Sequence, residues 1–181
     1  MRRYVAMLVL SVLLVGCGGD PQPAAPPAPA TPTGTTPTPV AAPTMPEQAT
    51  KNTRAGAVEF VRYYVEVLNY AARTGNLDEL TFLADRGCAS CKGVAEKLGT
   101  IYSRHGHVEG GVWRIKDLVH VAANRTIRGW FVSVLVTFEE QEIWRTAAGP
   151  PSQIKAGSHF LSFQVGRFTD GWRVVQWSRS S

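Results

Sequence analysis

The chain has 181 residues, and a net charge of +5 is spread over a sequence in which 18% of residues are charged. Its basic residues are scattered rather than clustered among aromatic side chains, which argues against a nucleic-acid-binding protein. A scattered excess of this size is typical of a solvated surface, with weak attraction to anionic lipid headgroups or wall polymers as the functional alternative. About 130 residues are available to fold, which corresponds to one domain.

The N-terminal stretch has the pattern of an export signal. Met1-Arg2-Arg3 is positively charged, and residues 4–15 are almost entirely apolar. A helix over this apolar run would be about 18 Å long at 1.5 Å per residue, which is too short for a bilayer core of about 30 Å. The run is therefore predicted to belong to a signal peptide rather than to a membrane span.

The sequence Leu14-Val15-Gly16-Cys17 at the end of this run resembles a bacterial lipobox. The resemblance implies that residues 1–16 are removed and that Cys17 becomes the first mature residue, carrying a thioether-linked diacylglycerol. Two acyl chains suffice for stable anchoring. We therefore expect a lipoprotein on the outer face of the bacterial cell membrane. The alternative is an ordinary secretory signal with an incidental cysteine.

Residues 17–52 are expected to form the lipidated cysteine and a disordered tether. Ten of the 12 prolines lie between residues 20 and 46, and alanine and threonine are common between them. Large apolar side chains are almost absent, so little burial is available to offset the entropy of ordering this segment. The segment is predicted to be a spacer, either bare or O-glycosylated on threonine.

Residues 53–181 carry the patterns of a folded domain, beginning with three helices. Thr53 is a candidate N-cap and Gly75 a candidate stop for the first helix. Its apolar residues recur at helical spacing: Val61, Tyr64, Val65, Leu68 and Ala72. A short second helix is predicted to end near Ala84, and a third to follow Gly87 and end at Gly106.

After Gly106 the apolar period changes to two, which predicts strands. Apolar rows are expected over residues 113–121, 130–138 and 159–165, and Thr169-Asp170-Gly171 is expected to form a hairpin turn before a last strand over 172–177. Helices followed by long antiparallel strands predict an α+β domain with three N-terminal helices on one face of a curved antiparallel sheet.

This order of elements, with a final Gly-Trp-Arg-Val hairpin, is similar to the NTF2-like (cystatin-like cone) superfamily over residues 53–179. Three stretches, at residues 60–64, 88–91 and 108–113, resemble a domain of unknown function found in lipoproteins of high-GC Gram-positive bacteria. The second resemblance implies a location and an architecture, not a reaction.

Cys88 and Cys91 are the cysteines that remain once Cys17 carries lipid. An exported protein meets oxidising surroundings, and positions i and i+3 at a helix start lie within disulfide reach, so we expect a structural disulfide. A redox Cys-x-x-Cys would favour a βαβ context that is missing here. A zinc site that used His105 and His107 as ligands would have an unusual spacing, because only one residue separates the two histidines. No metal and no cofactor are expected.

A cavity between the helices and the sheet is the candidate site that the NTF2-like resemblance implies. The residues predicted to be able to line it are Tyr63, Tyr64, Tyr70, Trp113, Trp130 and His159. Asp117 occupies the next alternate position after Trp113 and Ile115, where it interrupts the apolar row. It is the acidic residue that strict alternation along the strand would point inward. An isomerase-like enzyme would need such a group in the cavity. The competing interpretation is that these aromatics fill an ordinary core.

The sheet is also expected to have a second, partly apolar face. Phe131 and Leu135 oppose the row of Trp130, and Val175 and Trp177 are expected to oppose Trp172. Such a face suggests a homodimer or a partner surface. The function expected overall is a non-catalytic envelope module that binds a partner protein or a wall polymer. A small-molecule binder or enzyme using the cavity, and a thiol redox protein using Cys88 and Cys91, are the alternatives.

The lipobox predicts that protein recovered from the membrane fraction begins at Cys17 and carries acyl mass. Intact-mass measurement checks both points. A mature chain that begins elsewhere, or one without acyl mass, would contradict the prediction.

Overall fold

The computed structural model describes residues 40–180, so the predicted signal peptide, Cys17 and most of the predicted tether lie outside it. The described chain is α+β, as expected, with its helices N-terminal to its strands. It begins with the 3₁₀ helix η1 (Glu47–Thr50), followed by α1 (Arg54–Thr74), α2 (Asp78–Phe82) and α3 (Ala89–Ser103). In this part of the chain no helix has the length and apolar character needed to cross a membrane.

The strands form two antiparallel sheets rather than the single sheet expected from the sequence. The larger sheet has the order β2-β3-β6-β7, and the smaller has the order β1-β4-β5. The strands are β1 (His107–Gly110), β2 (Trp113–Asn124), β3 (Gly129–Phe138), β4 (Gln141–Trp144), β5 (Ser152–Ile154), β6 (Gly157–Phe168) and β7 (Gly171–Ser180).

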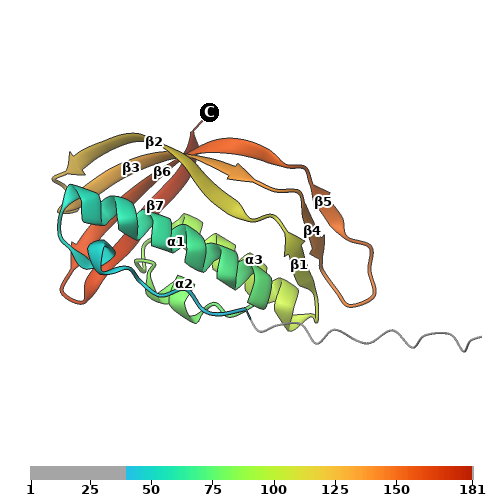
Figure 1. Cartoon of the computed structure of the whole chain (residues 1–181). Coiled ribbons are helices and arrows are strands. Elements are labelled where there is room, and N and C mark those ends of the chain that lie inside the picture. The colour runs from blue at the N-terminus through green and yellow to red at the C-terminus, as the bar shows by residue number, and fades with distance from the viewer. Residues whose placement is uncertain (1–39, 181) are drawn as a thin grey trace, which may run out of the picture. The chain divides into compact units, whose positions relative to one another are not determined.

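The two sheets are successive segments of the same strands, interrupted at a common bend. Only Gly111 and Val112 separate β1 from β2, and two residues likewise separate β3 from β4 and β5 from β6. Gly110 and Gly111 have φ of 65° and 68°, a conformation that glycine adopts without strain. The Gly111 N–H donates to the Glu140 carbonyl at 2.9 Å, which ties the two interrupted strands together. In Figure 1 the smaller sheet turns downward beyond the larger one.

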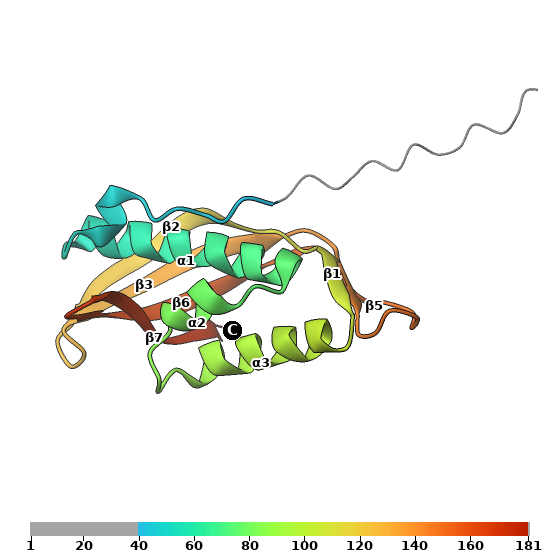
Figure 2. The ribbon, with the colours of Figure 1, turned by 90° about the horizontal axis from the view of Figure 1, so that it is seen from below.

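The caps expected for the first helix are confirmed. The Gly56 N–H donates to Thr53 Oγ1 at 3.0 Å, and Gly75 ends α1 with φ of 74°. Figure 2 shows α1 and α3 on the same face of the four-stranded sheet. There α1 packs mainly on β2 and β3, while α3 packs on β7.

The core lies between these helices and the sheet. The apolar rows predicted for β3 and β6 are confirmed, because alternate residues of both strands are buried. The largest fully buried side chains include Phe60 and Tyr64 of α1, Phe163 of β6 and Trp172 of β7. Phe60 stacks on Trp172, and Tyr64 meets Phe163 edge-on, with ring centroids 6.2 and 6.1 Å apart.

Because of irregular strand register, two side chains point in the opposite direction from the one expected from the sequence. In β2, Ile115 pairs with Val136 and Asp117 with Leu135, so one extra residue reverses the alternation and Asp117 is exposed. In β7, a similar shift beside Val165 places Trp177 opposite Phe163. Trp177 therefore faces the helices with Trp172, instead of opposing it. A β-bulge changes parity in this way because two residues face one on the partner strand.

The folded part also begins upstream of residue 53, the start expected from the sequence. Ala49 in η1 is fully buried, and Met45 packs against the core. Burial of these small and medium apolar side chains against α1 makes the end of the predicted tether a part of the domain.

Two helical glycines provide a matched test of this packing. A Cβ on Gly56 would overlap the Lys51 carbonyl oxygen, whereas a Cβ on Gly93 would meet open space. We expect Gly56→Ala to lower the free energy of unfolding by at least about 1 kcal/mol through steric overlap. Gly93→Ala should raise it by about 0.5–1 kcal/mol through helix propensity. Urea unfolding measures both, and equal gains in the two variants would contradict the packing of η1 on α1.

Candidate functional site

A pocket of about 210 Å³ lies where the two sheets meet the C-terminal half of α1 and the length of α3. Its walls come from α1, α3, β1, β4, the start of β2 and the end of β7. The lining residues are Leu68, Asn69, Ala72, Val94, Lys97, Leu98, Ile101, Val108, Gly111, Trp113, Gln141, Ile143 and Trp177. The bend between the sheets thus supplies one wall, and the helices supply the other.

The pocket wall is almost entirely apolar. Asn69, Lys97 and Gln141 are its polar side chains. The Asn69 amide is held by the Trp113 backbone, since its Nδ2 donates to the Trp113 carbonyl at 2.8 Å and its Oδ1 accepts from the Trp113 N–H at 2.9 Å. Among residues 40–180 no carboxylate or histidine lines this pocket, and the lining that the structure describes favours apolar binding over acid–base chemistry.

Aromatic rings connect the pocket to the core. Trp113 lies edge-on to Trp177, with ring centroids 6.3 Å apart, and Trp177 stacks on Phe163 at 6.2 Å. On its other side Trp113 lies 6.4 Å from Phe138. Such offset and edge-on pairs add to the stability gained from burial. The Trp113 and Trp177 walls are therefore held by each other and by neighbours on β3 and β6.

The predicted pocket residues do not gather in this pocket, apart from Trp113. Tyr63 and Tyr64 are buried in the core, where the Tyr63 hydroxyl donates to Glu79 Oε1 at 3.1 Å. Tyr70 is half-buried beside a separate depression that Ala41 and Pro43 also line. For these three tyrosines the structure favours the core-packing interpretation, or a surface position, over a shared cavity.

The remaining predicted residues lie further along the sheet. Trp130 packs against the core and borders a depression at the β2–β3 turn. His159 lies 4.9 Å from the Phe138 ring, with its Nε2 3.2 Å from Arg179 Nη1. The exposed Asp117 lies outside any inward-facing row because of the bulge in β2. The predicted carboxylate of an enzyme site is therefore not in the pocket.

Burial alters the acidity of several tyrosines. Burial, followed by the nearby negative charge of Glu79, raises the pKa of Tyr63 to about 12. Burial also raises the pKa of Tyr64, although an interaction with the Trp177 side chain acts in the opposite direction. Within the described residues, no hydrogen bond of ordinary geometry joins the Trp177 indole nitrogen to a partner. Both phenols stay protonated at neutral pH, so neither serves as a base.

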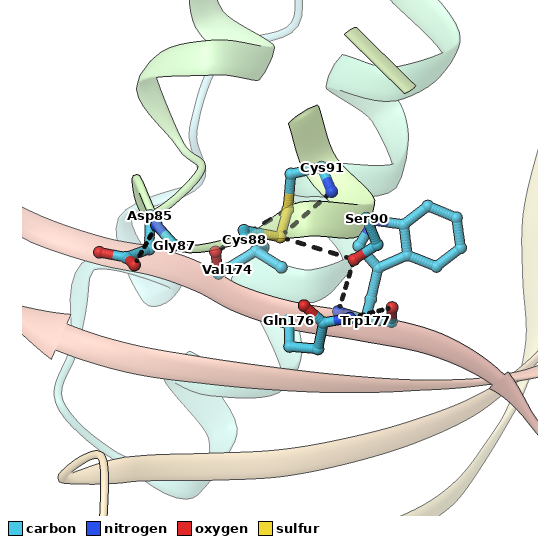
Figure 3. The surroundings of a disulfide bond; sticks show 8 residues. All are labelled: Asp85, Gly87, Cys88, Ser90, Cys91, Val174, Gln176 and Trp177. Carbon is cyan, nitrogen blue, oxygen red and sulfur yellow. Dashed lines mark hydrogen bonds between the residues drawn. A yellow bond between two sulfur atoms is a disulfide. The ribbon is translucent and has the colours of Figure 1, made fainter. Parts of the chain in front are cut away.

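The predicted bond between Cys88 and Cys91 is present at the start of α3. Figure 3 shows that it lies against β7, and the adjacent Ser90 Oγ accepts from the Trp177 N–H at 3.1 Å. Cys88 Sγ also accepts from the Cys91 N–H at 3.2 Å. The two cysteines are 1% and 2% exposed, although a surface depression between α2 and α3 reaches them. This burial favours a structural bond that seats α3 on β7, because thiol exchange needs an accessible sulfur.

The zinc alternative gains no support from the described residues. No group of three or more His, Cys, Asp or Glu side chains within residues 40–180 is placed to hold a metal ion. His107 instead stacks on Trp144, with centroids 5.4 Å apart, and its Nε2 lies 3.2 Å from Glu109 Oε1. His105 is exposed at the end of α3 with φ of 58°.

Sequence reasoning missed most of the pocket because it assigned the wall residues to the core. Leu98 and Ile101 lie in the predicted third helix, but helical spacing does not show which apolar residues border a hollow. Ile143 lies on β4, a strand of four residues, which is too short for its alternating pattern to be recognised in the sequence. The signal that was available is the Gly110-Gly111 pair, which marks the bend.

The disulfide yields a test that separates a structural bond from a redox centre. A loop of about four residues contributes roughly 2 kcal/mol in the chain-entropy model, so replacing both cysteines with alanine should lower the free energy of unfolding by about that amount. Dithiothreitol should reduce the bond slowly in the native protein and rapidly in urea, because burial blocks attack. Thiol counting measures both rates. Equal rates in the folded and unfolded chains would favour the redox alternative.

Comparison with known proteins identifies the family and supports the fold. The "Family of unknown function (DUF6318)" matches residues 28–177. No curated protein matches the sequence. A crystal structure of the intermembrane space region of the chloroplast protein ARC6 is similar, with a TM-score of 0.54 and 11% identity over 72% of this chain and 98% of that chain. That similarity shows a shared fold. Because the family model matches most of the chain, the protein belongs to the DUF6318 family of unknown function.

Proposed function

We propose that this protein is a lipid-anchored envelope lipoprotein whose domain is a non-catalytic binding module of the NTF2-like cone type. The lipobox at Cys17 supports the anchor. Three helices over one face of a bent antiparallel sheet, with a pocket between them, support the cone. The membrane is then the first partner of the protein, through its acyl chains.

The observation that carries the binding role is the pocket between α1, α3 and the bend. Its walls are mostly apolar, the Asn69 side chain on α1 is already bonded to the Trp113 backbone, and the aromatic walls are held in place by stacking. A preformed apolar hollow of this kind gains free energy when an apolar group displaces water from it. A small molecule, or the side chain of an envelope partner, would make the same gain.

The outer face of the four-stranded sheet supports a second role in self-association. Phe131 and Phe160 are 37% and 48% exposed there, on neighbouring strands. Ser133 and Ser162 lie between them, joined by a 2.9 Å hydrogen bond. A face of mixed character is suited to a weak homodimer or to an envelope partner rather than to an obligate interface.

Pocket filling tests the binding role. The probe is Nile red, an uncharged apolar dye, added to the unlipidated mature chain of residues 18–181. Ala72 lines the pocket, whereas Ala55 is exposed on the same helix. Ala72→Phe should weaken dye binding at least tenfold because the ring occupies the pocket. Ala55→Phe adds the same apolar side chain elsewhere and should leave binding unchanged.

Thermal melts establish that both variants fold. Equal dye binding by folded Ala72→Phe and by the unaltered chain would contradict the proposed role of the pocket.

A further inference from the structure

The apolar pocket adjoins a second depression with a different character. Lys97, Ile101 and Ile143 line both hollows, so the two adjoin each other between α3 and β4. The outer depression extends to Ile154 of β5, which is 42% exposed. We call the two hollows together the α3–β4 groove. Its inner part is lined almost entirely by apolar side chains, whereas its outer part also has charged side chains in its wall.

Positive charge collects at the outer end of the groove. Lys97, Arg104 and Arg145 line it and are exposed. In the described part of the chain none of these three side chains takes part in an ion pair or a side-chain hydrogen bond. Glu96 is the acid on this rim, and it already lies 3.8 Å from Lys92. The rim therefore carries a net positive charge with unengaged donors.

Lys97 borders both the apolar part and the charged part of the groove. It is exposed, yet it lines the inner pocket as well as the outer depression. A lysine commonly lays its methylene stem along apolar surface while its ammonium group stays in water. An occupant that fits this arrangement has an apolar tail for the inner pocket and an anionic group for the rim.

The size of the inner pocket limits the tail. About 210 Å³ is below the roughly 300–1,000 Å³ typical of sites for drug-sized ligands. A single slender chain fits that volume better than a double-chain lipid.

The chain leading to the proposed anchor approaches the same region. Ala41 and Pro43 line a depression together with Asn69 and Val112, and Asn69 also lines the pocket. The 22 residues between Cys17 and Val40 would span roughly 70 Å even if extended as polyproline II. On the proposed function, the groove is thus tethered within reach of a membrane that contains acyl chains.

We propose that the α3–β4 groove binds a single-chain anionic amphiphile, such as a fatty acid or an anionic lysophospholipid, with its acyl chain in the inner pocket and its headgroup at Lys97 and Arg145. This proposal rests on the proposed binding role and names its ligand class. Arg104 is left out of the test because it caps the C-terminus of α3, where a change would also alter the helix.

The test is displacement of Nile red from the mature chain of residues 18–181. The competitors are dodecanoate, dodecyl lysophosphatidylglycerol and dodecyltrimethylammonium, each below its micellar concentration. Both anions should displace the dye at concentrations at least tenfold lower than the cation. A lower value for one anion identifies a carboxylate or a phosphate source, and either supports the proposal.

Charge reversal locates the headgroup. Lys97→Glu combined with Arg145→Glu should weaken dodecanoate binding at least tenfold and remove the preference for anions. The matched control is Lys116→Glu combined with Arg125→Glu, which changes the net charge equally at exposed positions outside the groove. The control should change the affinity less than twofold.

Equal displacement by anion and cation, or equal affinities in the two double variants, would overturn the proposal. Nile red binding that neither anion displaces would also overturn it, while leaving the binding role of the pocket intact and indicating an apolar side chain of a protein partner. Failure of Nile red to bind at all would instead contradict the proposed function.

Discussion

Two hydrogen bonds between the Asn69 side chain and the backbone of Trp113 fix the point on which the rest of the architecture depends. Trp113 is the first residue of β2, an edge strand, so its outward N–H and carbonyl groups meet no neighbouring strand. The Asn69 amide supplies the missing donor and acceptor, at 2.8 and 2.9 Å. An edge strand is thereby tied to α1 two residues after Gly111, and unsatisfied backbone groups are avoided there.

The bend, once fixed in this way, determines the pocket. Gly110 and Gly111 turn the strand with positive φ, so that Val108 and Ile143 of the smaller sheet face the same hollow as Trp113. The Cys88–Cys91 bond seats the first turn of α3 against β7 and Trp177, which sets the opposite wall. Neither wall is built by a single local motif. The hollow arises because a helix, a disulfide and a strand bend are positioned by separate long-range contacts.

The sequence predicted those features that depend on local rules. Thr53 and Gly75 delimit α1, and the alternating rows of β3 and β6 are buried because both strands are regular. Features that depend on register were predicted wrongly. Single extra residues in β2 and β7 reversed Asp117 and Trp177, and no composition signal marks such bulges in advance. Ala49 was assigned to the tether because proline-rich composition surrounds it, whereas its burial depends on tertiary contact with α1. Most of the pocket lining was not predicted for the same reason, because residues that line a hollow and residues that fill the core follow the same apolar pattern in the sequence.

Amide chemical shifts of the ¹⁵N-labelled mature chain, recorded during a titration with dodecanoate, test the central claim most directly. If the bent sheet and α3 form the binding site, the largest shifts will occur at Gly111, Trp113 and Ile143, all of which line the pocket. Phe131 and Phe160 on the outer face of the sheet will change little. Shifts concentrated at Phe131 and Phe160, with the pocket residues unchanged, would contradict the account.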